Sequence, residues 1–209
     1  MSESESIYGP YRPVLEKVQS YLMDEISMVR QNVSRENGYD PVEHCPTRIK
    51  GEDSMREKCR RQNIPETTYS ALETIHDAIG IRIVCAFLND VYLFRDHLVS
   101  LPDTEIVQEK DYIRHAKPNG YRSYHLILKI HTPGGLVNDV DQKPHVYAEI
   151  QLRTISMDTW AALEHHLKYK KNISGSNQEL IVEELKRCAD ELASTDVSMQ
   201  TIRDMIHEL

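Results

Sequence analysis

The segment His145-Val-Tyr-Ala-Glu-Ile-Gln-Leu-Arg153 alternates between apolar and polar residues along its length. Because successive side chains of a β-strand point to opposite faces of a sheet, its four aliphatic residues share one face. The other face carries Tyr147, Glu149, Gln151 and Arg153. We therefore predict a strand that buries one face and whose polar face borders an open cleft.

The rest of the chain carries further strand and helix signals. The β-branched run Ile81-Arg-Ile-Val-Cys-Ala-Phe87 predicts a second, buried strand, and Gly80 marks the end of the helix before it. Additional strands are expected at about 105–113 and 123–131. Apolar residues at steps of three and four predict helices at about 13–32, 54–62, 64–80, 91–101, 154–169 and from 177 to the end. Turn residues separate the later elements at Pro133-Gly134-Gly135 and at Gly175.

Composition limits the class of protein. A chain of 209 residues fits one domain, or one domain with a helical appendage. Charged residues at 28% and a mean hydropathy of −0.53 exclude a membrane protein, and hydrophobic residues at 40% exclude a strongly disordered chain. The four cysteines are far apart, which is typical of reduced thiols in the cytoplasm. A net charge of −8 argues against DNA binding, so an anionic ligand needs a local basic patch.

Such a patch lies at residues 48–61, where six basic residues stand against three acidic ones. On a helix, Ser54, Lys58 and Arg61 would share one face. Arginine binds phosphate oxygens in pairs, and a serine near a helix start lies beside free backbone N–H groups. A phosphate chain is therefore a candidate ligand, and a solvated charged surface is the alternative.

Two carboxylates could form a metal site. Asp77 follows a predicted helix beside the strand at 81–87, and Glu149 lies on the polar face of the strand at 145–153. Mg²⁺ usually binds one or two carboxylates together with substrate phosphates, and such a pair could also accept a proton from a hydroxyl group. Helix capping or a salt bridge is the alternative role of Asp77. A phosphohydrolase site built on His76-Asp77 is disfavoured because the dipeptide adjoins a strand.

The segment Lys117-Pro-Asn-Gly-Tyr-Arg-Ser-Tyr-His125 combines a turn with aromatic and hydrogen-bonding side chains. An exposed Tyr121 in this loop could stack on a nucleic acid base or on the base of a nucleotide. Packing of the ring in the core is the alternative. The loop is therefore a candidate site for a base.

The last predicted helix carries an apolar heptad pattern. The pattern is typical of a helix that buries a narrow stripe against a partner helix, and packing within the chain is the alternative. Its members follow each other at steps of four and three: Ile181, Leu185, Cys188, Leu192, Thr195, Met199, Ile202, Ile206 and Leu209.

In this order, the segments resemble the synthetase domain of the RelA/SpoT family, and the short chain resembles the family's single-domain members, the small alarmone synthetases. The resemblance covers about residues 45–170. It rests on Arg48-x-Lys50-x3-Ser54-x3-Lys58, Asp77-x2-Gly80-x-Arg82, Lys110-Asp-Tyr112, Lys117-x-Asn119-Gly-Tyr121-x-Ser123-x-His125 and Glu149-Ile-Gln151-x-Arg153-Thr154.

The resemblance implies a GTP/GDP diphosphokinase, which makes (p)ppGpp by transferring pyrophosphate from ATP to the ribose 3′-hydroxyl of GDP or GTP and releases AMP. It implies that Asp77 and Glu149 bind Mg²⁺, and that Glu149 takes the proton of the attacking hydroxyl. The residues implied for ATP are Arg48, Lys50, Ser54, Lys58, Arg61 and Arg82, with Arg48 and Arg82 on either side of the adenine. Those implied for GDP or GTP are Tyr121, stacked on the guanine, with Lys110, Lys117, Asn119, His125 and Gln151.

The resemblance further implies an α/β (α+β) fold, with a mixed sheet flanked by helices and a nucleotidyltransferase-like core. We expect an N-terminal helical segment at 1–40, the synthetase core at 41–172 and a C-terminal helix at 173–209 that forms a homotetramer. A chain of this length leaves no room for a hydrolase domain, so no hydrolase activity is expected. Two other hypotheses remain open: a nucleotide-binding sensor without turnover, and an oligomeric scaffold or RNA-binding module.

Overall fold

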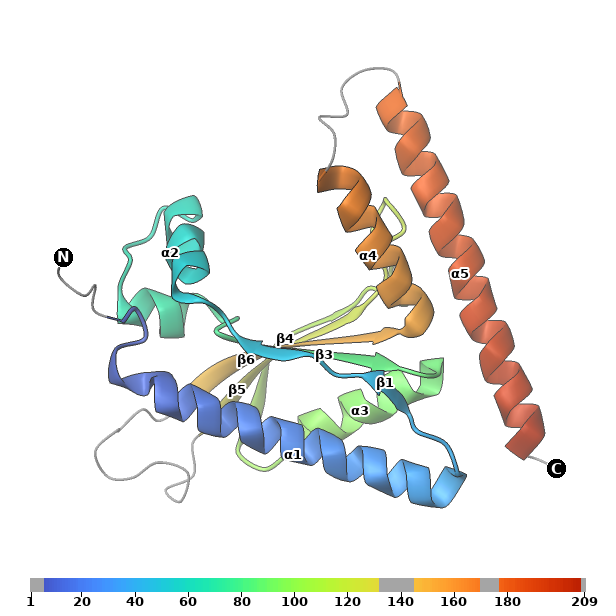
Figure 1. Cartoon of the computed structure of the whole chain (residues 1–209), viewed down its shortest axis with the longest axis horizontal. Helices are drawn as coiled ribbons and strands as arrows, with labels where there is room; N and C mark the ends of the chain where they lie inside the picture. The colour runs from blue at the N-terminus through green and yellow to red at the C-terminus, as the bar shows by residue number, and fades with distance from the viewer. Residues whose placement is uncertain (1–5, 132–144, 170–176, 208–209) are drawn as a thin grey trace.

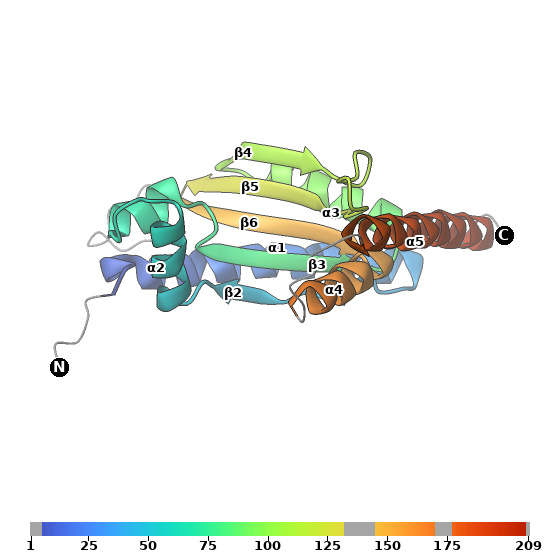
Figure 2. The same ribbon diagram turned by 90° about the horizontal axis from the view of Figure 1, so that it is seen from above.

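A mixed β-sheet forms the centre of the protein. The computed structural model describes residues 6–131, 145–169 and 177–207. The predicted turns at Pro133-Gly134-Gly135 and at Gly175 lie outside these residues. Within them, five strands follow the order β1-β3-β6-β5-β4, and β2 also pairs with β3. Seen from above, β2, β3, β6, β5 and β4 lie side by side (Figure 2).

The strands confirm the sequence signals. Central β3 and β6 run parallel, whereas the neighbouring pairs in the described sheet run antiparallel, so the sheet is mixed as predicted. Along β6 the four aliphatic residues are buried and the polar ones are partly exposed up to Gln151, which confirms the predicted alternation. The bounds are β1 (Val42–His44), β2 (Thr47–Ile49), β3 (Ile79–Cys85), β4 (Thr104–Asp111), β5 (Tyr124–His131) and β6 (His145–Thr154).

Helices cover the two faces of the sheet in different ways (Figure 1). Helices α1 and α3 lie along one face, where the buried sides of the strands form the core. Helix α2 stands at one end of the opposite face, and α4 with α5 stands at the other end. The bounds are α1 (Arg12–Asn37), α2 (Glu52–Arg61), α3 (Leu88–Ser100), α4 (Ile155–Tyr169) and α5 (Asn177–His207), with short helical turns η1 (Gly9–Tyr11) and η2 (Ser70–Thr74).

One predicted helix is wrong in extent. The sequence predicts a helix over 64–80, but only the turn η2 forms there. Ile79 already pairs with Ala148, and Gly80 pairs with Glu149, so the ladder with β6 begins two residues before the expected start of the strand. Hydrogen bonds to a neighbouring strand outweigh the weak helix preference of this segment.

The heptad pattern of α5 divides into two parts. In its first half Leu185 and Leu192 are partly buried, although Cys188 between them is exposed, and Trp160 Nε1 on α4 donates to the carbonyl oxygen of Leu185 at 2.9 Å. In the second half, Met199 and Ile202 are 49% exposed and Ile206 is 64% exposed. Packing within the described chain therefore accounts for the first half only.

Candidate active site

Strand register brings the predicted nucleotide-binding residues together on the open face of the sheet. His125 on β5 pairs with Gln151 on β6, and Gln151 pairs in turn with Arg82 on β3. Lys110 on β4 extends this row because it lies opposite His125. A second row joins Glu149 to Gly80, which pairs with Arg48 on β2. Residues from five strands, far apart in sequence, thus share one surface.

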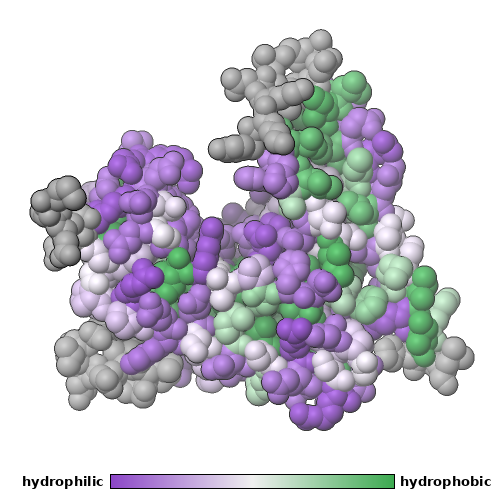
Figure 3. Space-filling model, in the orientation of Figure 1, coloured by the Kyte–Doolittle hydropathy of each residue, from purple (hydrophilic) through white to green (hydrophobic). Residues whose placement is uncertain are grey.

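A cleft of about 200 Å³ opens on this surface. Hydrophilic side chains gather in the recess between α2 and α4 in the space-filling view (Figure 3). A Cβ atom at Gly80 would lie 3.8 Å from Cγ of Arg48, so the Arg48 side chain lies directly over the glycine. The lining residues are Pro46, Thr47, Arg48, Gly80, Ile81, Arg82, Glu149 and Gln151.

Three of the residues predicted for the ATP phosphates lie on α2. Helix α2 starts after Gly51 and places Ser54, Lys58 and Arg61 on one face, as predicted. Ser54 and Arg61 are exposed, whereas Lys58 turns inward to Asp77.

Asp77 is held by two lysines. Its Oδ2 lies 2.6 Å from Nζ of Lys58 and 2.8 Å from Nζ of Lys50. Burial favours the neutral acid, but the hydrogen bonds from Lys50 and Lys58 outweigh it, and the pKa of Asp77 is lowered. The carboxylate is therefore charged at neutral pH and forms ion pairs with both ammonium groups.

The other oxygen of Asp77 fits the expected metal. Oδ1 is buried and has no hydrogen-bond partner among the described residues. No group of three or more histidine, cysteine or acidic side chains that could hold a metal was found in the described part of the chain. Mg²⁺ needs no such group, since it commonly takes one or two carboxylates and completes its shell with phosphates and water. Asp77 therefore offers one free oxygen that fits magnesium completed by a bound nucleotide.

The loop at 117–121 has its shape fixed by internal hydrogen bonds. Gly120 N–H donates to the carbonyl oxygen of Lys117 at 2.8 Å, and Tyr121 N–H donates to Oδ1 of Asn119 at 3.2 Å. The amide nitrogen of Asn119 donates to Oε1 of Glu164 on α4 at 3.1 Å. Asn119 thus anchors the loop, and Tyr121 follows immediately.

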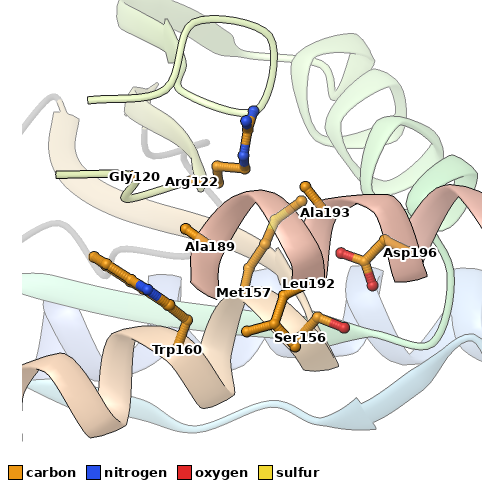
Figure 4. Close-up of a pocket in the computed structure, with 9 residues that line it drawn as sticks. All are labelled: Gly120, Arg122, Ser156, Met157, Trp160, Ala189, Leu192, Ala193 and Asp196. Carbon is orange, nitrogen blue, oxygen red and sulfur yellow. The ribbon is translucent and has the colours of Figure 1, made fainter. Parts of the chain in front are cut away.

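Helix α5 lies against this loop (Figure 4). Gly120 has a φ of +90°, and an added Cβ atom would lie 2.6 Å from Cβ of Ala189 and 3.0 Å from Cα of Lys186. Nη2 of Arg122 donates to Oδ1 of Asp190 at 3.1 Å. Only glycine fits this approach, so the position of the loop depends on α5.

Tyr121 and His125 form a hydrogen-bonded pair beside Glu149. The Tyr121 hydroxyl accepts a hydrogen bond from Nη2 of Arg153 at 2.8 Å and lies 2.9 Å from Nε2 of His125. Burial, followed by the positive charges of Arg153, Lys117 and Lys110, lowers the pKa of His125 to about 4. The imidazole is therefore neutral at neutral pH.

The imidazole of His125 also lies near the carboxylate of Glu149. Which ring nitrogen of His125 carries the proton decides whether the Tyr121 hydroxyl donates to Nε2 or accepts from it. Nδ1 of the ring is 3.9 Å from Oε1 of Glu149. A cation also covers the tyrosine, since Nζ of Lys117 lies 4.7 Å from the centroid of the Tyr121 ring.

Two residues of this site received no role from the sequence. Arg153 was placed on the polar face of its strand, but its contacts with Tyr121 and Gln151 could not be foreseen. Asp158 binds Arg153 and Arg82 from the first turn of α4. In the sequence, only its position just after the strand at 145–153 points to Asp158. That position is not specific to a functional site, because many helices have an acidic residue in their first turn.

The sequence pattern described as "Region found in RelA / SpoT proteins" matches residues 47–174. The chain is 40% identical over 179 residues to GTP pyrophosphokinase YwaC of Bacillus subtilis (strain 168), covering 86% of this chain and 82% of that protein. It is 34% identical over 199 residues to GTP pyrophosphokinase YjbM of the same organism, covering 95% and 88%.

Solved structures agree with these matches. The small alarmone synthetase 1 of Bacillus subtilis bound to its product pppGpp matches with a TM-score of 0.75 and 32% identity, covering 94% of this chain and 96% of that chain. The structure of the same synthetase bound to AMPCPP matches with a TM-score of 0.69 and 29% identity, covering 95% and 96%.

The chain belongs to the RelA/SpoT family. Within that family it is a small alarmone synthetase, the single-domain type of GTP pyrophosphokinase, and its mixed sheet flanked by helices is the fold of that type. None of the described helices is both long and apolar enough to span a bilayer.

Proposed function

We propose that the chain transfers pyrophosphate from ATP to the 3′-hydroxyl of GDP or GTP, with Glu149 as the general base. The observation that carries the proposal is the place of Glu149 on the open sheet. On one side it adjoins His125 of the guanine side, and on the other it pairs with Gly80 beneath Arg48 of the ATP side. A base at this point lies between the two nucleotides, where the proton must be removed.

On the ATP side, the proposal assigns the phosphates to the lysines that hold Asp77. Lys50 and Lys58 are 15% and 21% exposed, so a phosphate chain in the cleft can reach them. We assign Ser54 and Arg61 to the same phosphates and Arg82 with Arg48 to the adenine. Magnesium, bound by Asp77 and Glu149, would neutralise charge on the phosphates.

On the guanine side, the proposal assigns the base to the Tyr121 ring. Gln151 and His125 are partly exposed neighbours in one row of the sheet, and Lys110 continues it outward. Lys117 lies over the tyrosine ring and supplies positive charge beside an anionic nucleotide. We assign Asn119 an indirect role, in which its hydrogen bonds to Glu164 and to the Tyr121 N–H hold the loop in the shape that presents the tyrosine ring to the nucleotide.

We also propose that α5 joins copies of this chain into a homotetramer. Its exposed apolar residues continue into a groove of about 310 Å³ lined by Tyr39, Phe87 and Arg203. A second copy is the favoured occupant because the exposed half of the pattern is an apolar stripe at heptad spacing. Two such stripes can pack against each other across a symmetric interface. The four unpaired cysteines support a cytoplasmic location.

Incubation of the full chain with Mg²⁺, GDP and ATP labelled in the β-phosphate tests the reaction. We expect the label to move to the guanine nucleotide and AMP to be released, and Glu149→Gln to stop both while AMPCPP and GDP still bind. Bound nucleotide without AMP release in the wild type would instead identify a sensor. Unchanged turnover in Glu149→Gln would exclude the assigned base.

A further inference from the structure

Asp158 contacts residues from both halves of the site. It lies in the first turn of α4, and its side chain is only 16% exposed. Its Oδ1 accepts hydrogen bonds from Nη1 of Arg153 at 2.9 Å and from Nη1 of Arg82 at 3.4 Å. Its Oδ2 lies 3.3 Å from Nε2 of His44. One carboxylate thus holds two guanidinium groups that come from neighbouring strands.

Arg153 carries this contact to the guanine side. Its side chain is 7% exposed, so its positive charge needs a nearby negative partner, and Asp158 is that partner. From the opposite nitrogen, Nη2, it donates to the hydroxyl of Tyr121 at 2.8 Å and to Oε1 of Gln151 at 3.1 Å. Because a guanidinium is planar and rigid, holding one nitrogen in place orients the other.

Arg82 carries the contact to the ATP side. Its side chain is 43% exposed and lines the cleft, while Nη1 is held by Asp158. Its Nε is buried and has no hydrogen-bond partner in the described part of the chain. The side chain is thus anchored at one nitrogen and partly exposed in the cleft, where a base could stack on it.

We propose that Asp158 is a positioning residue that orients the binding groups for both nucleotides at once, through Arg82 for ATP and through Arg153 for GDP or GTP. The proposal rests on the proposed assignment of Arg82 to adenine and of Tyr121 with Gln151 to guanine. It differs from a merely structural ion pair in one respect. A structural pair stabilises the fold, whereas this carboxylate sets the affinity of two separate ligands.

The test is direct calorimetric titration of the full chain with AMPCPP and, separately, with GDP. Asp158→Asn is expected to raise both dissociation constants about tenfold, because each ligand loses a group fixed by a charge-assisted hydrogen bond. A rise in only one constant, or in neither, would overturn the proposal. Asp40→Asn is the matched control, since it removes an exposed arginine–aspartate pair with Arg30, and neither constant should change.

Three further variants separate the link from the site assignment. Arg82→Gln should weaken AMPCPP only, and Tyr121→Ala should weaken GDP only. Failure of that selectivity would refute the assignment of the two sites and the link with it. Arg153→Lys keeps the buried charge but loses the planar fork, so it should weaken GDP about tenfold and leave AMPCPP unchanged. If Asp158→Asn does not fold, Asp158→Glu, which keeps the charge but displaces the carboxylate, takes its place: both dissociation constants should rise, and a rise in only one or in neither would overturn the link.

Discussion

Nζ of Lys58 lies 2.6 Å from Oδ2 of Asp77, and Nζ of Lys50 reaches the same oxygen at 2.8 Å. The single carboxylate assigned to magnesium therefore offsets only part of the charge of two cations assigned to the ATP phosphates. Because an ammonium group has three N–H donors, a phosphate chain that binds Lys50 and Lys58 competes with Asp77 for them. The contacts with Asp77 meanwhile keep both partly buried ammonium groups paired before a nucleotide binds.

Replacement of that carboxylate should affect binding and turnover in opposite directions. Asp77→Asn frees both lysines, so AMPCPP should bind several-fold more tightly in EDTA, while AMP release with Mg²⁺ is lost. Titration calorimetry and the labelled-ATP assay measure the two effects. The control is Glu57→Gln, which removes an exposed carboxylate from α2, the helix that carries Lys58. It should change neither AMPCPP binding nor AMP release strongly. Weaker binding of AMPCPP to Asp77→Asn in EDTA would refute this competition.

A methyl group at position 120 should disturb the guanine side alone. Gly120→Ala forces apart the loop and α5, since the new atom would lie 2.6 Å from Cβ of Ala189. We expect a loss of about 1–3 kcal/mol in stability and clearly weaker GDP binding, with AMPCPP binding retained. The matched control is Gly38→Ala, which has a φ of +70° but no neighbour within 4 Å. Equal GDP affinity in the two variants would contradict the role of α5.

His125 should make the fold less stable as the pH falls from about 6.5 to about 4. Its pKa is lowered to about 4 in the folded protein, against an ordinary value of 6.5, so the unfolded chain binds the proton first. The free energy of unfolding should therefore fall across this window by on the order of 3 kcal/mol and lose nothing more from this group below it. Urea unfolding in metal-free buffer measures the slope.

The same titration on two variants assigns the effect. His125→Gln should remove this part of the pH dependence. His166→Gln, which alters an exposed histidine on α4, should retain it. A slope that survives in His125→Gln would place its origin elsewhere.

Charge on the exposed half of α5 should separate the subunits. Ile202→Glu together with Ile206→Glu would bury two unpaired carboxylates in the proposed interface, so light scattering should give the mass of a monomer. Thr201→Glu adds a charge on the same helix outside the heptad pattern and should leave the assembly intact. A monomeric wild type would end the proposal, as would an unchanged mass in the double variant.

Several parts of the site were predictable because they depend only on the local geometry of one strand or one helix. Alternation along 145–153 placed Glu149 and Gln151 on one face before any partner was known, and β6 has that pattern. Likewise, the spacing of four residues predicted that Ser54 and Lys58 share one face of a helix, as they do on α2. By contrast, the helix over 64–80 was wrong, because pairing with β6 competes for its last residues and such pairing is not visible in a local pattern.

The sequence by itself indicated the family, the main strands, the polar face of the strand at 145–153 and the candidate catalytic residues. These depend on periodicity and motif spacing, which are local properties of the chain. Folding alone determined that Lys50 and Lys58 pair with Asp77, that α5 approaches Gly120, and that Asp158 contacts arginines on two strands. Apart from the contact between Asp158 and Arg153, which are five positions apart, these contacts join residues 19 to 76 positions apart, with Asp158 and Arg82 the most distant pair. Their distances depend on how the sheet is ordered and where helices cross it, which no single segment encodes.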